Sequence, residues 1–102
     1  MERKARSETI KTISSSTFGG WRYGGELDDY TFEAKVCSVD SMRGIKYGHV
    51  MKLFVYEKKS SKEVAVYQYG WDMYPKTPEI QMLTERIIDH LEQLAKAENN
   101  KA

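Results

Sequence analysis

Alternation of apolar and polar positions marks the strands of this chain. The run over residues 30–38 alternates most regularly, which predicts a half-buried antiparallel strand. Its apolar side consists of Tyr30, Phe32, Ala34 and Val36. The segments 49–57 and 63–69 show the same period of two, and the charged loop between them predicts a hairpin. The segment 49–57 has bulky apolar residues on both sides, which is typical of a central strand.

A fourth, shorter strand is predicted at FGGWRYGG, residues 18–25, where aromatic residues lie between two glycine pairs. From Pro78 onward the apolar residues recur every three or four positions, which predicts an amphipathic helix that ends near Ala97. Thr77 is expected to cap the helix, with proline in the first helical position. The apolar stripe consists of Ile80, Leu83, Ile87, Leu91 and Leu94.

These elements predict an α+β fold, in which an antiparallel meander of three or four strands carries one C-terminal helix packed on one face. We expect a single domain at residues 18–97, after a polar N-terminal arm at 1–17 and before a frayed tail at 98–102. A short strand, or a basic segment that orders on a partner, is the alternative for the arm. The predicted bed of the helix is Phe32, Ala34, Val36, Leu53, Val55, Val64 and Val66.

The stretch VAVYQYGWDMYPKTP, residues 64–78, links the last predicted strand to the helix. Gly70 is expected to end the strand by allowing a turn conformation that other residues resist. Trp71 is expected to be a core residue under the helix. Asp72 is expected to accept backbone N–H bonds that fix the loop. These three residues are therefore predicted to have a structural role.

Charge and cysteine content exclude some settings. The 102 residues include 16 Lys and Arg and 15 Asp and Glu, and the net charge of +1 gives no general attraction to nucleic acid. The charge is uneven, because 1–62 has 12 basic and 8 acidic residues, a net +4, and 63–102 has 4 and 7, a net −3. Cys37 is the only cysteine, so no disulfide can form within the chain, and a cytoplasmic location is expected. No segment has the apolar length of a signal peptide or a membrane span, so no membrane association is expected.

Catalytic chemistry is not indicated by the residue pattern. His49, His90 and Cys37 lack the spacing of metal ligands, so neither a metal nor another cofactor is expected. The acidic residues at 26–29 are typical of a turn rather than of a catalytic carboxylate pair. We therefore predict no catalytic residue and expect a protein that is not an enzyme.

The segment Y-x-x-G-W-D-x-x-P-x-T, from Tyr67 to Thr77, resembles a small family of unknown function from phages and prophages of Gram-positive bacteria. FEAKV at residues 32–36 fits the same layout, and the resemblance covers about residues 18–95. It implies a small phage or mobile-element protein and supplies no catalytic residues. The residues that carry it are Val64, Ala65, Tyr67, Gly70, Trp71, Asp72, Pro75 and Thr77.

Aromatic residues indicate a binding surface. Those on the sheet face away from the helix are expected to gather into an interaction patch, together with the tips of the loop at residues 40–48. The patch is also the expected interface of a homodimer, with cover by the N-terminal arm as the alternative. The predicted binding residues are Trp21, Tyr23, Phe54, Tyr56, Tyr67, Tyr69, Arg43, Lys46 and Tyr47.

Two functions are consistent with such a patch. The preferred hypothesis is a non-enzymatic protein that binds a host protein, for example an inhibitor of a host defence nuclease (anti-CRISPR-like), and it rests on analogy. The alternative is a module for single-stranded nucleic acid, with bases stacked on aromatic rings among Arg22, Lys35 and Lys52. It ranks second because no RNP-type motif is present.

Overall fold

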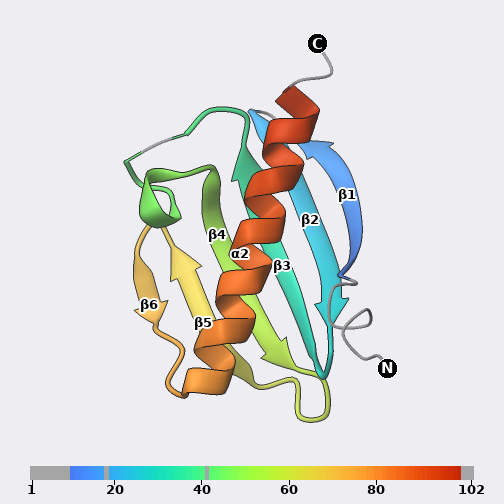
Figure 1. Ribbon diagram of the computed structural model, residues 1–102, viewed down its shortest axis with the longest axis vertical. Helices are drawn as coiled ribbons and strands as arrows, with labels where there is room; N and C mark the ends of the chain where they lie inside the picture. Colours follow the sequence, from blue (N-terminus) through green and yellow to red (C-terminus); the bar gives the residue numbers. More distant parts are fainter. Residues whose placement is uncertain (1–9, 18, 41, 100–102) are drawn as a thin grey trace, which may run out of the picture.

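The computed structural model describes residues 10–17, 19–40 and 42–99. These form one antiparallel sheet of six strands in the order β1-β2-β3-β4-β5-β6, and a long C-terminal helix runs diagonally across one face of it (Figure 1). The fold is therefore α+β, as predicted. The elements are β1 (Lys11–Thr17), β2 (Gly20–Leu27), β3 (Tyr30–Cys37), η1 (Ile45–Tyr47), β4 (Val50–Glu57), β5 (Glu63–Gln68), β6 (Trp71–Met73) and α2 (Pro78–Asn99).

The sheet has six strands, so the prediction of three or four strands is wrong at both edges. Strand β1 falls within the predicted N-terminal arm and pairs with β2 along its whole length, from Lys11 opposite Glu26 to Thr17 opposite Gly20. Strand β6 falls within the predicted loop and pairs briefly with β5. Both edge strands form by backbone pairing: β1 is polar except for Ile13, and β6 has only three residues, too few to show the alternation that marks inner strands. Residues 1–9 of the arm and residues 100–102 of the tail lie outside the described residues.

The core lies between α2 and the sheet. The predicted helix stripe is confirmed, because Leu83, Ile87 and Leu91 are all buried there. Thr77 caps the helix as predicted, since its hydroxyl oxygen accepts the N–H of Ile80 at 3.2 Å. The sheet residues that were predicted to meet the helix and that do belong to this core are Phe32, Ala34, Val36, Leu53 and Val55.

The predicted orientation of β5 is wrong by one residue. Ala65 lies opposite Val55 and Tyr67 lies opposite Leu53, so these two residues, both buried, face the helix. Val66 lies opposite Phe54 on the other face of the sheet. A register shift at Tyr56 accompanies this arrangement and leaves Val64 outside the ladder, at the margin of the core. A slip of one residue exchanges the two faces of a strand.

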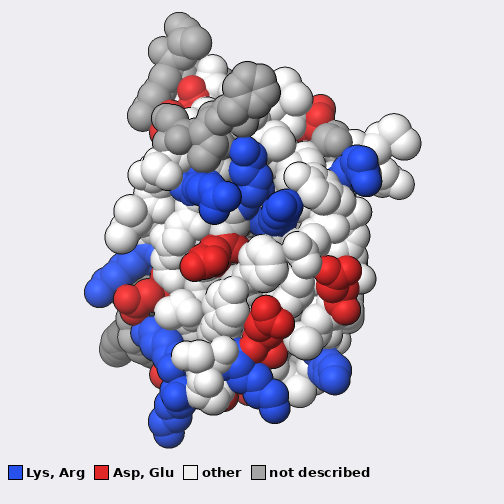
Figure 2. All heavy atoms as spheres, turned by 180° about the vertical axis from the view of Figure 1, so that it is seen from behind, with Lys and Arg blue, Asp and Glu red and all other residues white. Residues whose placement is uncertain are grey.

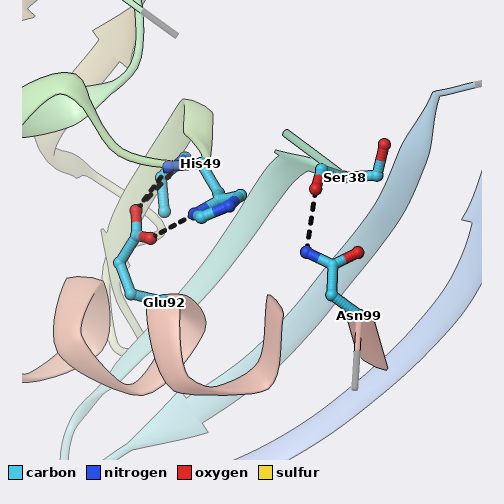
Figure 3. Close-up of polar contacts among 5 residues, drawn as sticks. Ser38, His49, Glu92 and Asn99 are labelled. Carbon is cyan, nitrogen blue, oxygen red and sulfur yellow. Dashed lines mark hydrogen bonds and ion pairs between the residues drawn. The ribbon is translucent and has the colours of Figure 1, made fainter. Parts of the chain in front are cut away.

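A carboxylate on α2 joins the second half of the helix to the start of β4. One oxygen of Glu92 accepts the backbone N–H groups of His49, at 2.7 Å, and Val50, at 3.2 Å, and the other lies 2.7 Å from His49 Nδ1 (Figure 3). A Cβ atom on Gly48 would lie 2.3 Å from this carboxylate, so any other residue there would require the Glu92 side chain to shift. The side-chain amide of Asn99 adds a bond to the carbonyl of Ser38 at 2.8 Å (Figure 3).

A second polar contact connects α2 to the edge of the sheet. The Nε2 atom of His90 lies 2.9 Å from the hydroxyl oxygen of Thr12 on β1. That hydroxyl donates to the carbonyl of Ile10, so its oxygen is the acceptor for His90. Burial lowers the pKa of His90, which favours the neutral ring in this contact.

Ile87 is the residue whose truncation tests the placement of the helix. It is fully buried at the centre of the stripe, so Ile87→Ala should lower the free energy of unfolding by about 2–5 kcal/mol through lost burial and the cavity left behind. Gln93→Ala, on the exposed side of the same helix, should change it by less than about 0.5 kcal/mol. Chemical denaturation of both variants measures the difference. Equal effects would contradict the observed helix face.

Candidate functional site

The candidate site is the sheet face that α2 does not cover, which we call the open face. Among the described residues no helix or strand packs over it (Figure 1). Its centre holds a shallow hollow of about 820 Å³ that extends from β1 to β4 and reaches Tyr69 after β5. Residues 13–15 of β1, 22–26 of β2 and 31–35 of β3 line it, together with Lys52, Phe54 and Tyr56 of β4. A broad, shallow surface of this kind fits an extended ligand better than a small enclosed substrate.

Three cationic side chains form a line across the open face. Arg22 on β2 lies directly opposite Lys35 on β3, and Lys35 lies directly opposite Lys52 on β4. We call these three residues the cation row. Figure 2 shows a group of Lys and Arg side chains together in the upper half of this face, with acidic side chains below it. Because neighbouring strands are about 4.8 Å apart, this register places like charges side by side at a cost in stability.

The next residues along the strands have the opposite character. Glu33 lies two residues from Lys35 on the same side of β3, and it is opposite Gly24 on one side and Phe54 on the other. Farther along, Glu26 forms an ion pair with Lys58 at 2.8 Å. Glu33 forms no ion pair with any of the residues that the structure describes. The open face is thus divided into a cationic half and a half with an exposed carboxylate.

Aromatic side chains line the same surface. Phe54 and Tyr56 of β4 are half-buried in the hollow, and Tyr69 is 47% exposed. Burial raises the pKa of Tyr56, and the charges of Glu33 and Glu63 raise it further, so its hydroxyl stays protonated. The open face therefore offers aromatic surface and hydrogen-bond donors beside the cation row.

Tyr69 connects the sheet to the loop that precedes β4. Its ring centre lies 5.3 Å from the guanidinium carbon of Arg43 and 5.4 Å from the ammonium nitrogen of Lys52, which are cation–π distances. Its backbone is left-handed, with φ of 60°, a conformation that costs a bulky residue about 1–2 kcal/mol. The backbone N–H of Tyr69 donates to the carbonyl of Met51 at 3.0 Å, which helps to hold it there. Strain of this kind is concentrated at binding sites.

The structure brings together only part of the predicted binding set. Phe54, Tyr56, Tyr69 and Arg43 do meet on or beside the open face. The placement of Tyr23 and Tyr67 there is wrong, because both are buried in the core on the helix side. Trp21 packs against that core as well. The remaining two predicted residues, Lys46 and Tyr47, are exposed in η1, where Lys46 forms an ion pair with Glu85 of α2.

Sequence reasoning missed Glu33 as a site residue and misjudged the turn after β5. The alternation of β3 already placed Glu33 on the same side as Lys35, and that was the available signal. The left-handed residue of the turn is Tyr69, and Gly70 has no positive φ. Trp71 is 37% exposed rather than a core residue, and it packs edge-to-face against Tyr67 and Tyr74.

Asp72 also differs from its predicted role. Its carboxylate accepts the side-chain amide of Gln68 at 2.7 Å. This bond crosses the turn between β5 and β6, so Asp72 does help to fix the loop, through a side chain instead of the backbone. Among the described residues, no three His, Cys, Asp or Glu side chains are grouped as metal ligands would be.

A comparison with protein families gives one match. The family described as "Domain of unknown function (DUF7678)" matches residues 21–92 of the chain. The chain belongs to this family. The DUF7678 match begins in β2 and ends in α2, so it contains the cation row, Glu33 and Tyr69, and it leaves out β1. Neither the curated proteins nor the solved structures contain a match to the chain.

The description of the DUF7678 family assigns no chemistry to its members. In the part of the chain that the structure describes, no helix combines the length and the apolar character needed to cross a bilayer.

The strain at Tyr69 can be measured with two substitutions that remove the same ring. Tyr69→Gly should be more stable than Tyr69→Ala by about 1 kcal/mol, because only glycine adopts the left-handed backbone without cost. At Tyr74, which is exposed and has no positive φ, the order should be reversed. Thermal or chemical denaturation of the four variants gives the comparison. A more stable alanine variant at both positions would show that Tyr69 is not held in the strained conformation.

Proposed function

We propose that the protein is a binding module without catalytic activity, and that its open face holds a segment of single-stranded nucleic acid. The observation that carries the proposal is the cation row of Arg22, Lys35 and Lys52 beside half-buried and exposed aromatic side chains on one shallow surface. Three cations in direct register on one surface are the arrangement that favours binding of a chain of phosphate groups.

The chemistry of the surface matches both parts of such a ligand. Phosphate groups are bound by Lys and Arg side chains, and unstacked bases are bound by aromatic rings. In a duplex the bases are stacked on each other and cannot cover the rings of Phe54 and Tyr69. A neutral protein overall can still bind in this way when its cations are gathered on one face.

The charge of Lys52 provides the test. Lys52→Glu should weaken the binding of a fluorescein-labelled single-stranded oligonucleotide about tenfold at low salt, because it places a carboxylate in the cation row. Lys59→Glu, in the exposed β4–β5 loop, makes the same charge change far from the row and should have little effect. Fluorescence anisotropy over a salt series measures both. If the wild-type protein does not bind the oligonucleotide at low salt, the proposed function is wrong.

A second candidate is protein binding, and a separate surface favours it. The rings of Trp71 and Tyr74 pack edge-to-face with centres 5.1 Å apart, and they are 37% and 57% exposed at the edge of the sheet. Exposed aromatic clusters are typical of protein interfaces. In this alternative the chain is a phage or mobile-element protein of the cytoplasm that binds itself as a dimer or binds a host protein such as a defence nuclease. The resemblance of its G-W-D segment to phage and prophage proteins of Gram-positive bacteria supports that origin.

Trp71→Glu separates the two candidates. It should leave oligonucleotide binding unchanged, because the side chain does not line the hollow of the open face. If the aromatic edge is a protein interface, the same substitution should abolish a dimer mass measured by light scattering, or a complex with a purified defence nuclease. A wild-type monomer that binds no such nuclease would remove this candidate.

A further inference from the structure

The two halves of the open face fix how a nucleic-acid strand can lie on it. Phosphates are attracted to the cation row and repelled by the carboxylate of Glu33, which is two residues, about 6–7 Å, farther along β3. A strand that follows the row therefore crosses the β-strands. Its bases then extend over the half of the face that contains Glu33, Phe54 and Gly24.

This second half has a place for a base. Directly opposite residues make a row of Ile13, Gly24, Glu33 and Phe54 across β1 to β4. Gly24 has no side chain, so it leaves a depression between the apolar side chains. A Cβ atom added there would have its nearest neighbour at 3.8 Å, so the space is open. Ile13 is 81% exposed on one side, and Phe54 offers a ring on the other.

The polar group at this place accepts hydrogen bonds and cannot donate them. Glu33 is exposed and forms no ion pair among the described residues, whereas Glu26, on the same face, is engaged by Lys58. An ionised carboxylate pairs with the exocyclic amino groups of cytosine, adenine or guanine. Thymine and uracil have a carbonyl oxygen in place of that group, and their one ring N–H donor lies between two carbonyl oxygens that repel a carboxylate.

We propose, on the basis of the proposed function, that Glu33 reads the bases of the bound strand. The site therefore prefers single strands whose bases bear an exocyclic amino group over oligothymidine and oligouridine. Glu33 is a specificity residue in this arrangement, and the cation row supplies affinity that does not depend on sequence.

The test compares oligo-dC with oligo-dT of equal length, and each with its ribonucleotide counterpart, by fluorescence anisotropy. The wild-type protein should bind the cytosine strands roughly tenfold more tightly, as expected for a hydrogen bond to a charged acceptor. Glu33→Gln should strengthen binding to both strands, because it removes a negative charge, and should bring the ratio close to one. The amide both donates and accepts, so it does not distinguish the two bases.

Asp89→Asn is the matched control, because it removes one negative charge from the exposed side of α2, behind the sheet. It should keep the wild-type ratio. Thermal melts of both variants confirm that each is folded. Equal wild-type affinity for the two strands, or a ratio that Glu33→Gln leaves unchanged, would overturn the role of Glu33 while the proposed function stands. Failure of the wild-type protein to bind either strand would overturn the proposed function itself.

Discussion

One helix packed on a sheet that has two faces is the constraint on which this structure depends. The buried stripe of α2, centred on Ile87, covers the face formed by alternate residues of β2 to β5 and supplies most of the apolar burial. The other face has no helix or strand packed over it among the described residues. The cation row and Glu33 lie on the face that α2 leaves uncovered.

Prediction from the sequence succeeded for the elements in which only one side is apolar. The alternation of Phe32, Ala34 and Val36 with polar residues fixed the inward side of β3, and the spacing of Leu83, Ile87 and Leu91 fixed that of α2. Strand β5 is different, because both of its sides are apolar. One side has Val64 and Val66, and the other has Ala65 and Tyr67. Periodicity cannot choose between two apolar sides. The pairing of β5 with β4 determines which side faces the helix. As a result, Tyr67 lies in the core and not on the expected binding surface.

The sequence predicted the type of surface, aromatic and cationic, better than it predicted which residues form it. The sequence placed cations among aromatic residues, and the strand register then brought three of the cations into one line. Arg22, Lys35 and Lys52 were already named together from the sequence, but their direct alignment depends on register, which is a property of two strands. The strained backbone of Tyr69 was also hidden, because glycine at position 70 offered a simpler explanation for the same turn.

The buried hydroxyl of Tyr67 helps to hold the loop that carries Arg43. It donates a hydrogen bond, at 2.9 Å, to the backbone carbonyl of Arg43. At the other end of that loop, Glu92 holds the backbone of His49. Arg43 is thus carried by a segment that is fixed from the core side before any ligand arrives. In the proposed function, a loop held in this way loses less conformational entropy when a ligand binds, so the contact from Tyr67 would add to affinity by pre-organising Arg43.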